Sequence, residues 1–340
     1  MDLNTIWFIL VGVLFTGYAV LDGFDLGVGA LHLLARTDEE RRLSINAIGP
    51  VWDGNEVWLV TGGGALFAAF PEVYASVFSG FYVAFFLFLA ALVFRAVAIE
   101  FRSKQQMRWW RGMWDVSFSV ASVMAALLLG VAMGNVVWGV PLNASGHFPN
   151  EFSFFSLLRP YALLMGLTTV ALFTMHGAIY LYLKTEGEMQ RHVKQWIRPS
   201  IIAFVVLYAL LSLATLIYVP QATARVREQP LLFLVVVVSI LAIADIPREI
   251  FFERPMRAFL ASCLTMASLM ALFGLNVFPD LVHSRPNPDN SLDIYNAASS
   301  QKTLFIMLVI AIIGVPLVLS YTASIYWVFR GKVRLNEASY

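Results

Sequence analysis

The chain has 340 residues, of which 59% are hydrophobic and only 13% are charged, and its net charge is +1. Soluble globular proteins carry about 45–50% apolar and about 25% charged residues, so one soluble core cannot bury this much apolar surface. The composition therefore excludes an ordinary soluble enzyme, a disordered chain and a protein with a basic face for nucleic acid. The single cysteine, Cys263, excludes a disulfide framework and a thiolate metal site.

Nine apolar stretches are long enough to cross a bilayer, which takes about 20 residues of helix. They cover roughly residues 5–34, 51–70, 76–101, 113–138, 157–183, 199–219, 231–247, 258–278 and 303–329. Most connections are short, so neighbouring helices are expected to be antiparallel. The N-terminus has no Lys or Arg before the first stretch, and we expect no cleavable signal peptide. The sequence predicts an all-α polytopic membrane protein with nine transmembrane helices.

The distribution of basic residues predicts the orientation. Seventeen of the 23 Lys and Arg residues lie in the connections from odd to even helices or in the C-terminal tail. The opposite connections hold four: Arg225, Arg227, Arg285 and Lys302. Because basic loops stay in the cytoplasm, the N-terminus is expected outside and the C-terminus in the cytoplasm.

Ionisable residues gather in the first three predicted helices. They are Asp22, Asp25, Asp53, Glu56, Arg95 and Glu100. Charges in hydrocarbon are costly, so each of these residues marks a candidate site. Counted from the helix ends at about 1.5 Å per residue, all six fall in the cytoplasmic half of the membrane. One arginine cannot neutralise five acids, so some carboxyls are expected to be protonated, hydrated or paired with another subunit.

Two interpretations of this cluster remain open from spacing alone, with substrate binding as a third. Carboxyls that reach from the cytoplasm toward the middle of the membrane could deliver protons. Alternatively, Asp22, Asp25 and Arg95 form a structural ion-pair network, and Asp53 caps the N-terminus of the second helix. We also expect Asp115 to be an interfacial acid in the first turn of the fourth helix.

Other polar residues favour structural roles. Asp245, Glu249 and Glu253 are expected to form a solvated ion-pair cluster with Arg248 and Arg254. His176 is the one histidine well inside a predicted span. It differs in depth from His32, which makes the two a poor pair of haem ligands, so we expect a hydrogen-bonded core histidine. Gly54 and residues 62–64 give the second helix a small-residue surface that another helix can approach closely.

Several motifs resemble one known family, subunit II of the bacterial cytochrome bd-type quinol oxidase. The two most specific are Asp22-Gly23-Phe24-Asp25-Leu26-Gly27-Val28-Gly29 and Pro50-Val51-Trp52-Asp53-Gly54-Asn55-Glu56-Val57-Trp58. Others are Phe94-Arg95, Phe101-Arg102-Ser103-Lys104, Met113-Trp114-Asp115, Gly139-Val140-Pro141 and Ala298-Ser299-Ser300-Gln301. The resemblance covers nearly the whole chain and is densest over residues 20–141.

The resemblance implies a fold of two four-helix bundles plus one peripheral helix. The first bundle would occupy residues 1–140 and the second 141–279, and residues 280–340 would hold an outer loop, the ninth helix and the cytoplasmic C-terminus. The connection at about 220–230 is short, whereas some relatives carry a long polar insertion there, which puts any contact built from that loop in doubt.

The resemblance also implies a heterodimer with a haem-bearing subunit I in the bacterial cytoplasmic (inner) membrane. That complex oxidises quinol and reduces oxygen to water, and it generates a membrane potential without pumping. Two b-type haems and one d-type haem, or a b-type variant, are expected in subunit I and none in this chain. A structural quinone and a small single-helix accessory subunit occur in some members. The expected partners are therefore subunit I, quinol, oxygen and the lipid bilayer, with no nucleic acid.

Carried over residue by residue, the resemblance assigns a proton path to Asp53 and Glu100, flanked by Asp22 and Asp25. Trp52, Arg95 and Glu56 would shape this path. The chain would also support assembly and haem insertion in subunit I.

Two other functions compete with this one. A proton-coupled secondary transporter would place its acids near the midplane at broken helices, whereas these acids cluster toward one side. A haem-b membrane anchor would use His176, and a spectrum of the isolated subunit would test that function.

Overall fold

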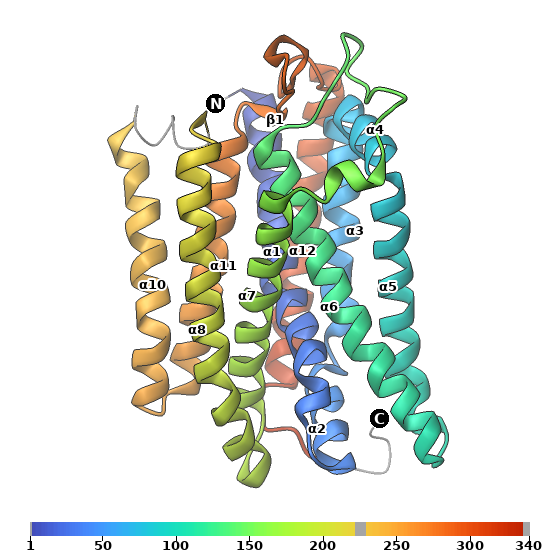
Figure 1. Ribbon diagram of the computed structural model, residues 1–340, viewed down its shortest axis with the longest axis vertical. Coiled ribbons are helices and arrows are strands. Elements are labelled where there is room, and N and C mark those ends of the chain that lie inside the picture. Colours follow the sequence, from blue (N-terminus) through green and yellow to red (C-terminus); the bar gives the residue numbers. More distant parts are fainter. Residues whose placement is uncertain (1, 222–228, 336–340) are drawn as a thin grey trace.

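Residues 2–221 and 229–335 are described in a computed structural model of the chain (Figure 1). The first half holds α1 (Leu3–Leu31), α2 (Asp38–Ile48), α3 (Trp52–Ala69), α4 (Pro71–Gly80), α5 (Tyr82–Phe101) and α6 (Arg108–Trp138). The second half holds α7 (Pro160–Lys184), α8 (Gly187–Tyr218), α10 (Phe233–Phe251), α11 (Pro255–Val277) and α12 (Gln301–Val328). A small antiparallel pair, β1 (Asp280–Val282) and β2 (Leu292–Asp293), lies in the loop before α12. Most of the short connection expected at 220–230, with Arg225 and Arg227, lies outside the described residues.

Short 3-10 turns extend or precede several helices. They are η1 (His32–Leu34), η2 (Arg102–Lys104), η3 (Phe154–Leu157), η4 (Pro230–Leu232) and η5 (Pro288–Asn290). The turns η1 and η2 prolong α1 and α5 at the same end of the molecule.

Within the described ranges, eight helices are long and apolar enough to cross a membrane. They are Leu3–Leu34, Tyr82–Lys104, Arg108–Trp138, Pro160–Lys184, Gly187–Tyr218, Pro230–Phe251, Pro255–Val277 and Gln301–Val328. The predicted all-helical, multi-span chain is therefore confirmed. The predicted count of nine depends on α3, which has 18 residues and begins with the polar positions Asp53, Asn55 and Glu56.

Two local features differ from the expectation based on hydropathy. The stretch predicted at 76–101 is broken at Phe81, whose backbone leaves the helical region between α4 and α5. The connection after the first span contains an amphipathic helix, α2, which begins at Asp38 and has Thr37 as its N-cap. The Thr37 side chain accepts a hydrogen bond from the backbone N–H of Glu40, and three acids in the first turn interact favourably with the helix dipole.

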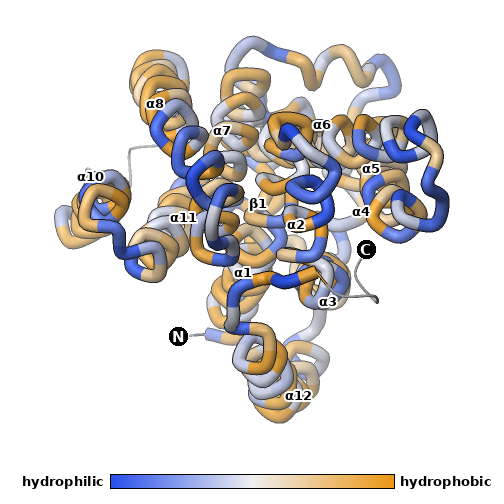
Figure 2. The backbone as a smooth tube through the Cα atoms, turned by 90° about the horizontal axis from the view of Figure 1, so that it is seen from below, coloured by the Kyte–Doolittle hydropathy of each residue, from blue (hydrophilic) through white to orange (hydrophobic). Residues whose placement is uncertain are grey.

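Helix α1 lies at the centre of the molecule and contacts α3, α6, α7, α11 and α12 (Figure 2). Its residues 22–29 are buried throughout. A Cβ atom on Gly27 would lie 1.8 Å from the Phe173 carbonyl oxygen of α7, and one on Gly177 would lie 2.4 Å from the carbonyl carbon of Gly27. Glycine at both positions is therefore needed for α1 and α7 to approach this closely.

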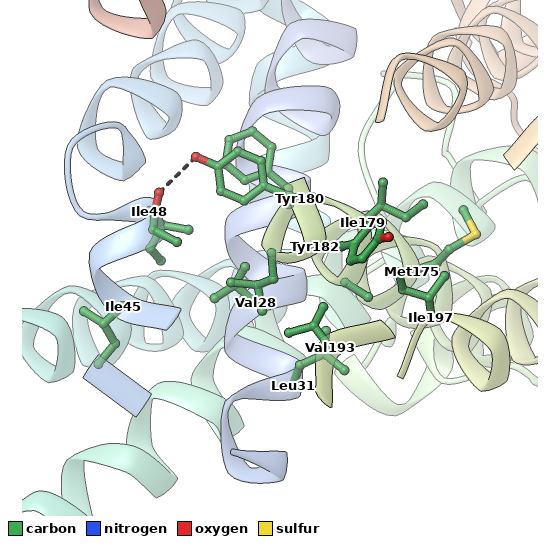
Figure 3. Close-up of a cluster of buried hydrophobic side chains, with 14 of the residues drawn as sticks. Val28, Leu31, Ile45, Ile48, Met175, Ile179, Tyr180, Tyr182, Val193 and Ile197 are labelled. Carbon is green, nitrogen blue, oxygen red and sulfur yellow. Dashed lines mark hydrogen bonds between the residues drawn. The ribbon is translucent and has the colours of Figure 1, made fainter. Parts of the chain in front are cut away.

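An apolar cluster fixes α2 against the lower ends of α1, α7 and α8 (Figure 3). Its labelled members are Val28, Leu31, Ile45, Ile48, Met175, Ile179, Tyr180, Tyr182, Val193 and Ile197. The Tyr180 hydroxyl donates to the carbonyl of Ala47 at 2.9 Å, and the Tyr180 ring stacks on Phe24 with centroids 3.9 Å apart. This packing holds the acidic segment of α1 in a rigid setting.

Helix α12 is the most exposed of the long helices and is held mainly at its two ends. At the upper end, Trp7 Nε1 donates to the Leu304 carbonyl at 2.9 Å. At the lower end, the Tyr326 hydroxyl donates to Asn55 Oδ1 at 2.9 Å, and Lys184 Nζ donates to the carbonyls of Phe329 and Gly331. Between these ends, a groove of about 770 Å³ lies between α12, α1 and α11.

Candidate functional site

A buried ion-pair cluster surrounds Arg95 of α5. Its guanidinium makes two bonds to Asp22, Nη2–Oδ1 at 2.7 Å and Nη1–Oδ2 at 3.1 Å, and a third from Nη1 to Glu56 Oε1 at 2.9 Å. Asp25 Oδ2 lies 3.9 Å from Nη2. The side chains of Arg95, Asp22 and Asp25 are 0% exposed, and that of Glu56 is 22% exposed. The structure thus brings together four of the six residues grouped from the sequence.

The local sequence explains how three helices meet here. Asp22 and Asp25 are three residues apart, so both point from one face of α1. Arg95 lies six residues before the end of α5, which places its guanidinium at the level of the two aspartates. Glu56 reaches the same arginine from the second turn of α3.

Two residues extend the cluster beyond what the sequence predicts. Asn55 Nδ2 donates to Asp25 Oδ2 at 2.7 Å and to the Leu21 carbonyl at 3.2 Å. Its Oδ1 accepts the hydrogen bond from Tyr326, which is 271 positions away in the chain. Asn55 belongs to the polar Trp-Asp-Gly-Asn motif and could have been singled out, whereas no sequence signal connects Tyr326 to it.

The charges of this cluster do not balance. Arg95 supplies one positive charge against three carboxyls, so complete ionisation would leave two uncompensated negative charges. Asp25 Oδ1 is buried and makes no hydrogen bond with any described residue. Buried unpaired charge is strongly unfavourable, which favours protonated carboxyls here. Chemically, the cluster can store and exchange protons.

Asp53 lies apart from the buried cluster, in the exposed first turn of α3. The N-cap position belongs to Val51 and no side chain caps this helix, so the predicted capping role of Asp53 is wrong. Asp53 precedes Glu56 by three residues and shares its side of the helix. The structure therefore places an outer acid, Asp53, next to a half-buried acid, Glu56, which contacts Arg95.

The remaining candidate residues occupy different settings. Trp52 is buried in the apolar cluster with Val28 and Ile48. Glu100 is half-buried one residue before the end of α5, about 7.5 Å along the helix from Arg95.

Asp115 is the centre of a second ionic cluster, so its expected role as an interfacial first-turn acid is wrong. Its carboxylate lies 2.6 Å from His32 Nε2, and it accepts bonds from Arg102 Nε at 2.5 Å and Arg41 Nη1 at 2.9 Å. Arg102 also pairs with Asp38 at 2.8 Å. The reason is that α6 begins at Arg108, so Asp115 lies two turns inside the helix and is 1% exposed.

We expect Asp115→Asn to destabilise the protein severely, because it removes the negative charge shared by His32, Arg41 and Arg102. Breaking a buried pair on one side costs about 3–5 kcal/mol. The thermal unfolding of the purified complex measures this loss. Asp245→Asn is the matched control, since Asp245 pairs with the exposed Arg248 and a surface pair contributes about 0–1 kcal/mol. Equal losses in the two variants would contradict the assignment of Asp115 as the centre of this cluster.

The expected ion-pair cluster at the end of α10 is present. Arg248 pairs with Asp245 at 2.9 Å. Glu253 differs from the expectation, since it pairs at 2.6 Å with Lys194 of α8 rather than with Arg248 or Arg254. Glu249 differs from the expectation because its side chain is buried, 3.9 Å from Arg254.

His176 has hydrogen-bond partners on both ring nitrogens. Nδ1 lies 2.7 Å from Ser262 Oγ, and Nε2 donates to the Val20 carbonyl at 3.0 Å. The ring also stacks on Phe259. The predicted hydrogen-bonded core histidine is confirmed. Across the part of the chain that the structure describes, no group of three or more His, Cys, Asp or Glu side chains is placed to hold a metal ion.

Comparisons with known proteins agree on one family. The family model for cytochrome bd terminal oxidase subunit II matches residues 3–329. Cytochrome bd-I ubiquinol oxidase subunit 2 of Escherichia coli (strain K12) is 39% identical over 98% of this chain and 96% of the relative. Cytochrome bd ubiquinol oxidase subunit 2 of Bacillus subtilis is 35% identical over 99% of this chain and 98% of the relative.

One solved structure has a similar fold. A chain of the bd oxidase from Geobacillus thermodenitrificans superposes with a TM-score of 0.79 at 18% identity, covering 97% of this chain and 98% of that one.

Proposed function

Because the chain belongs to the cytochrome bd terminal oxidase subunit II family, we propose that it is the subunit without haem in a quinol:oxygen oxidoreductase of the inner membrane. In this proposal it packs against a haem-bearing subunit I, supports assembly and haem insertion there, and supplies a proton path from the cytoplasmic side. The observation that carries the proposal is the pair of acids on α3, which connects an exposed helix face to the buried Arg95 cluster.

The exposed face of α3 supports contact with subunit I. Asp53, Val57, Val60, Gly64 and Phe67 recur every three or four residues and are all exposed. A carboxylate on a lipid-facing surface is unfavourable, so a protein partner is expected to cover this face. A Cβ atom on Gly64 would meet nothing within 4 Å, which leaves room for a second helix to pack closely.

The proton path runs from the cytoplasmic side through the carboxyls around Arg95 and Glu56 to Asp53. Asp22 and Asp25 flank the path and hold protons whose charge Arg95 only partly balances. Trp52 shapes it by anchoring the first turn of α3 in the apolar cluster, and Glu100 supplies a second acid near the cytoplasmic end of α5. Asp53 would then pass protons to the oxygen-reducing centre of subunit I.

The proposed orientation places the N-terminus outside, according to the distribution of basic residues. Protons for water formation then come from the cytoplasm, while quinol oxidation releases protons outside, so turnover separates charge without pumping.

The proposal retains two four-helix bundles, residues 1–140 and 141–279, followed by a peripheral ninth helix within 280–340. The high exposure of α12 supports its peripheral place.

Cofactors follow the same division between subunits. The two b-type haems and the d-type haem, or its variant, are proposed for subunit I, together with quinol and oxygen as substrates. A single-helix accessory subunit would join the complex.

The groove between α1, α11 and α12 fits the apolar tail of a structural quinone, because Ile9, Val13, Met270 and Leu319 are among its lining residues. Its volume of about 770 Å³ is in the usual range for small-molecule sites.

A cofactor spectrum tests the proposal. The chain is expected to purify with a partner that carries all visible haem absorption, and a His176→Gln complex is expected to keep the same haem-to-protein ratio. Haem bound by this chain alone, or loss of one haem in the His176→Gln complex, would support the haem-anchor alternative. Purification without any haem-bearing partner would favour the transporter.

A further inference from the structure

Two arginines flank Gly139, where α6 ends and the chain turns toward α7. Arg159 directly precedes α7, and its Nε and Nη1 donate to the carbonyls of Ser156 at 3.1 Å and Gly139 at 3.3 Å. The guanidinium of Arg285 lies 5.0 Å above the ring of Trp138, the last residue of α6. Gly139 lies between the two arginines: its carbonyl accepts the bond from Arg159, and a Cβ atom built on it would lie 3.1 Å from the Cβ of Arg285.

The positive charge of this pair has no carboxylate partner among the described residues. Arg159 donates to backbone carbonyls and Arg285 stacks on an indole ring, while the neighbouring Asp280 pairs with His283 at 3.1 Å. Burial lowers the pKa of Arg159, and the nearby charge of Arg285 lowers it further. Two close cations in a partly desolvated setting attract an anion, and guanidinium groups suit phosphate oxygens in particular.

The surface below Arg159 is apolar and faces away from the rest of the protein. Leu163 and Leu167 follow Arg159 at intervals of four residues, so the three residues lie on one side of α7. The side chain of Leu163 is 36% exposed and that of Leu167 is 51% exposed. Phe155, just before α7, is 78% exposed. Exposed aromatic rings at the level of the headgroups and an exposed leucine stripe at acyl-chain depth are typical of lipid contact.

We propose that Arg159 and Arg285 bind the phosphate of an anionic phospholipid in the outer leaflet, with an acyl chain along Leu163 and Leu167. Helix α7 packs mainly against α6, α8, α1 and α11, whereas α3 packs mainly against α1 and α4, so α1 separates the helix that carries Arg159 from the helix assigned to subunit I (Figure 2). A lipid can therefore occupy it in the assembled complex. The assignment to the outer leaflet rests on the proposed orientation, whereas the binding of anionic lipid does not.

The test is lipid binding to the purified oxidase complex, measured by native mass spectrometry during titration with phosphatidylglycerol or phosphatidylcholine. The wild-type complex is expected to bind phosphatidylglycerol more tightly than phosphatidylcholine. The Arg159→Gln/Arg285→Gln complex is expected to bind phosphatidylglycerol about tenfold more weakly, which corresponds to about 1.4 kcal/mol. Lys302→Gln, which removes an exposed cation on the same side, is the control and is expected to change nothing.

Several outcomes would overturn the proposal. The first is unchanged phosphatidylglycerol binding in the double variant. The second is equal binding of the two lipids by the wild-type complex. The third is displacement of the lipid by an equal concentration of inorganic phosphate, which would indicate a site for free anions.

If the double variant does not assemble, the exposed Arg285 is tested alone. Arg285→Gln should weaken binding, and Arg285→Lys, which keeps the charge without the planar guanidinium, should weaken it less. Equal binding by these two variants would contradict the site. Because lipid occupancy is measured without turnover, failure here is distinct from failure of the proton path.

Discussion

Turnover of the assembled oxidase is expected to fall at least about tenfold when Asp53 is replaced by asparagine, while the haem content stays unchanged. A positioned proton-transfer group typically contributes about 10²–10⁴-fold to a rate. We place the expected loss below this range because Asp53 is exposed in this chain, and water at the subunit boundary replaces part of its function. Oxygen consumption with excess quinol, normalised to haem, measures the effect.

Two variants control for the structural alternative. Asp53→Glu keeps the carboxyl and is expected to recover most of the turnover. Glu72→Gln removes an exposed first-turn acid from α4, at the opposite end of α3, and is expected to leave turnover unchanged. Full turnover in Asp53→Asn would contradict the proton path, and so would loss of the assembled complex in that variant, since it would assign Asp53 a packing role.

Replacing Arg95 with glutamine is expected to destabilise the protein severely. The substitution leaves Asp22, Asp25 and Glu56 around a neutral side chain, and Asp22 loses both of its bonds to the guanidinium. Removing one partner of a buried pair costs about 3–5 kcal/mol. The yield of haem-loaded complex from membranes and its thermal unfolding measure the loss. Arg248→Gln, at an exposed ion pair, is the matched control.

A second substitution separates charge imbalance from simple loss of packing. In Arg95→Gln/Asp22→Asn, one buried negative charge is removed together with the positive one, so part of the lost stability should return. Groups in direct contact show coupling energies of about 0.5–3 kcal/mol. Strictly additive losses in the two single variants and the double variant would show that charge compensation is not what Arg95 provides.

The helical layout could be predicted because long apolar stretches directly record where a chain crosses a membrane. The pairing of Arg95 with Asp22 and Asp25 was also accessible, since spacing places both acids on one helix face at the depth of the arginine. The break at Phe81 was not accessible, because hydropathy is high on both sides of it. Helix α2 was missed because its pattern is short and polar, and its stability depends largely on packing onto α1, α7 and α8.

The acidic residues of the candidate site could be predicted from the sequence, whereas its neutral hydrogen-bonding residues could not. Asn55 and Tyr326 are 271 positions apart, and no local pattern indicates that the last long helix supplies a hydroxyl to the third. Asp115 was misjudged for a related reason. Its three partners come from separate turns and helices, and periodicity within one helix says nothing about them. Asp53 was found through its motif, but only the structure separates it from the buried cluster.

The position of Tyr326 has a consequence for biogenesis. The ribosome makes this residue after every other member of the Arg95 network, so Asn55 acquires its hydroxyl partner only when the final helix has left the translocon and settled against α1. A nascent chain that stops before α12 already contains Arg95 and all the buried acids, yet its Asn55 lacks the donor that Tyr326 supplies. Docking of the last helix thus completes the hydrogen bonding of the network after its charged members are in place.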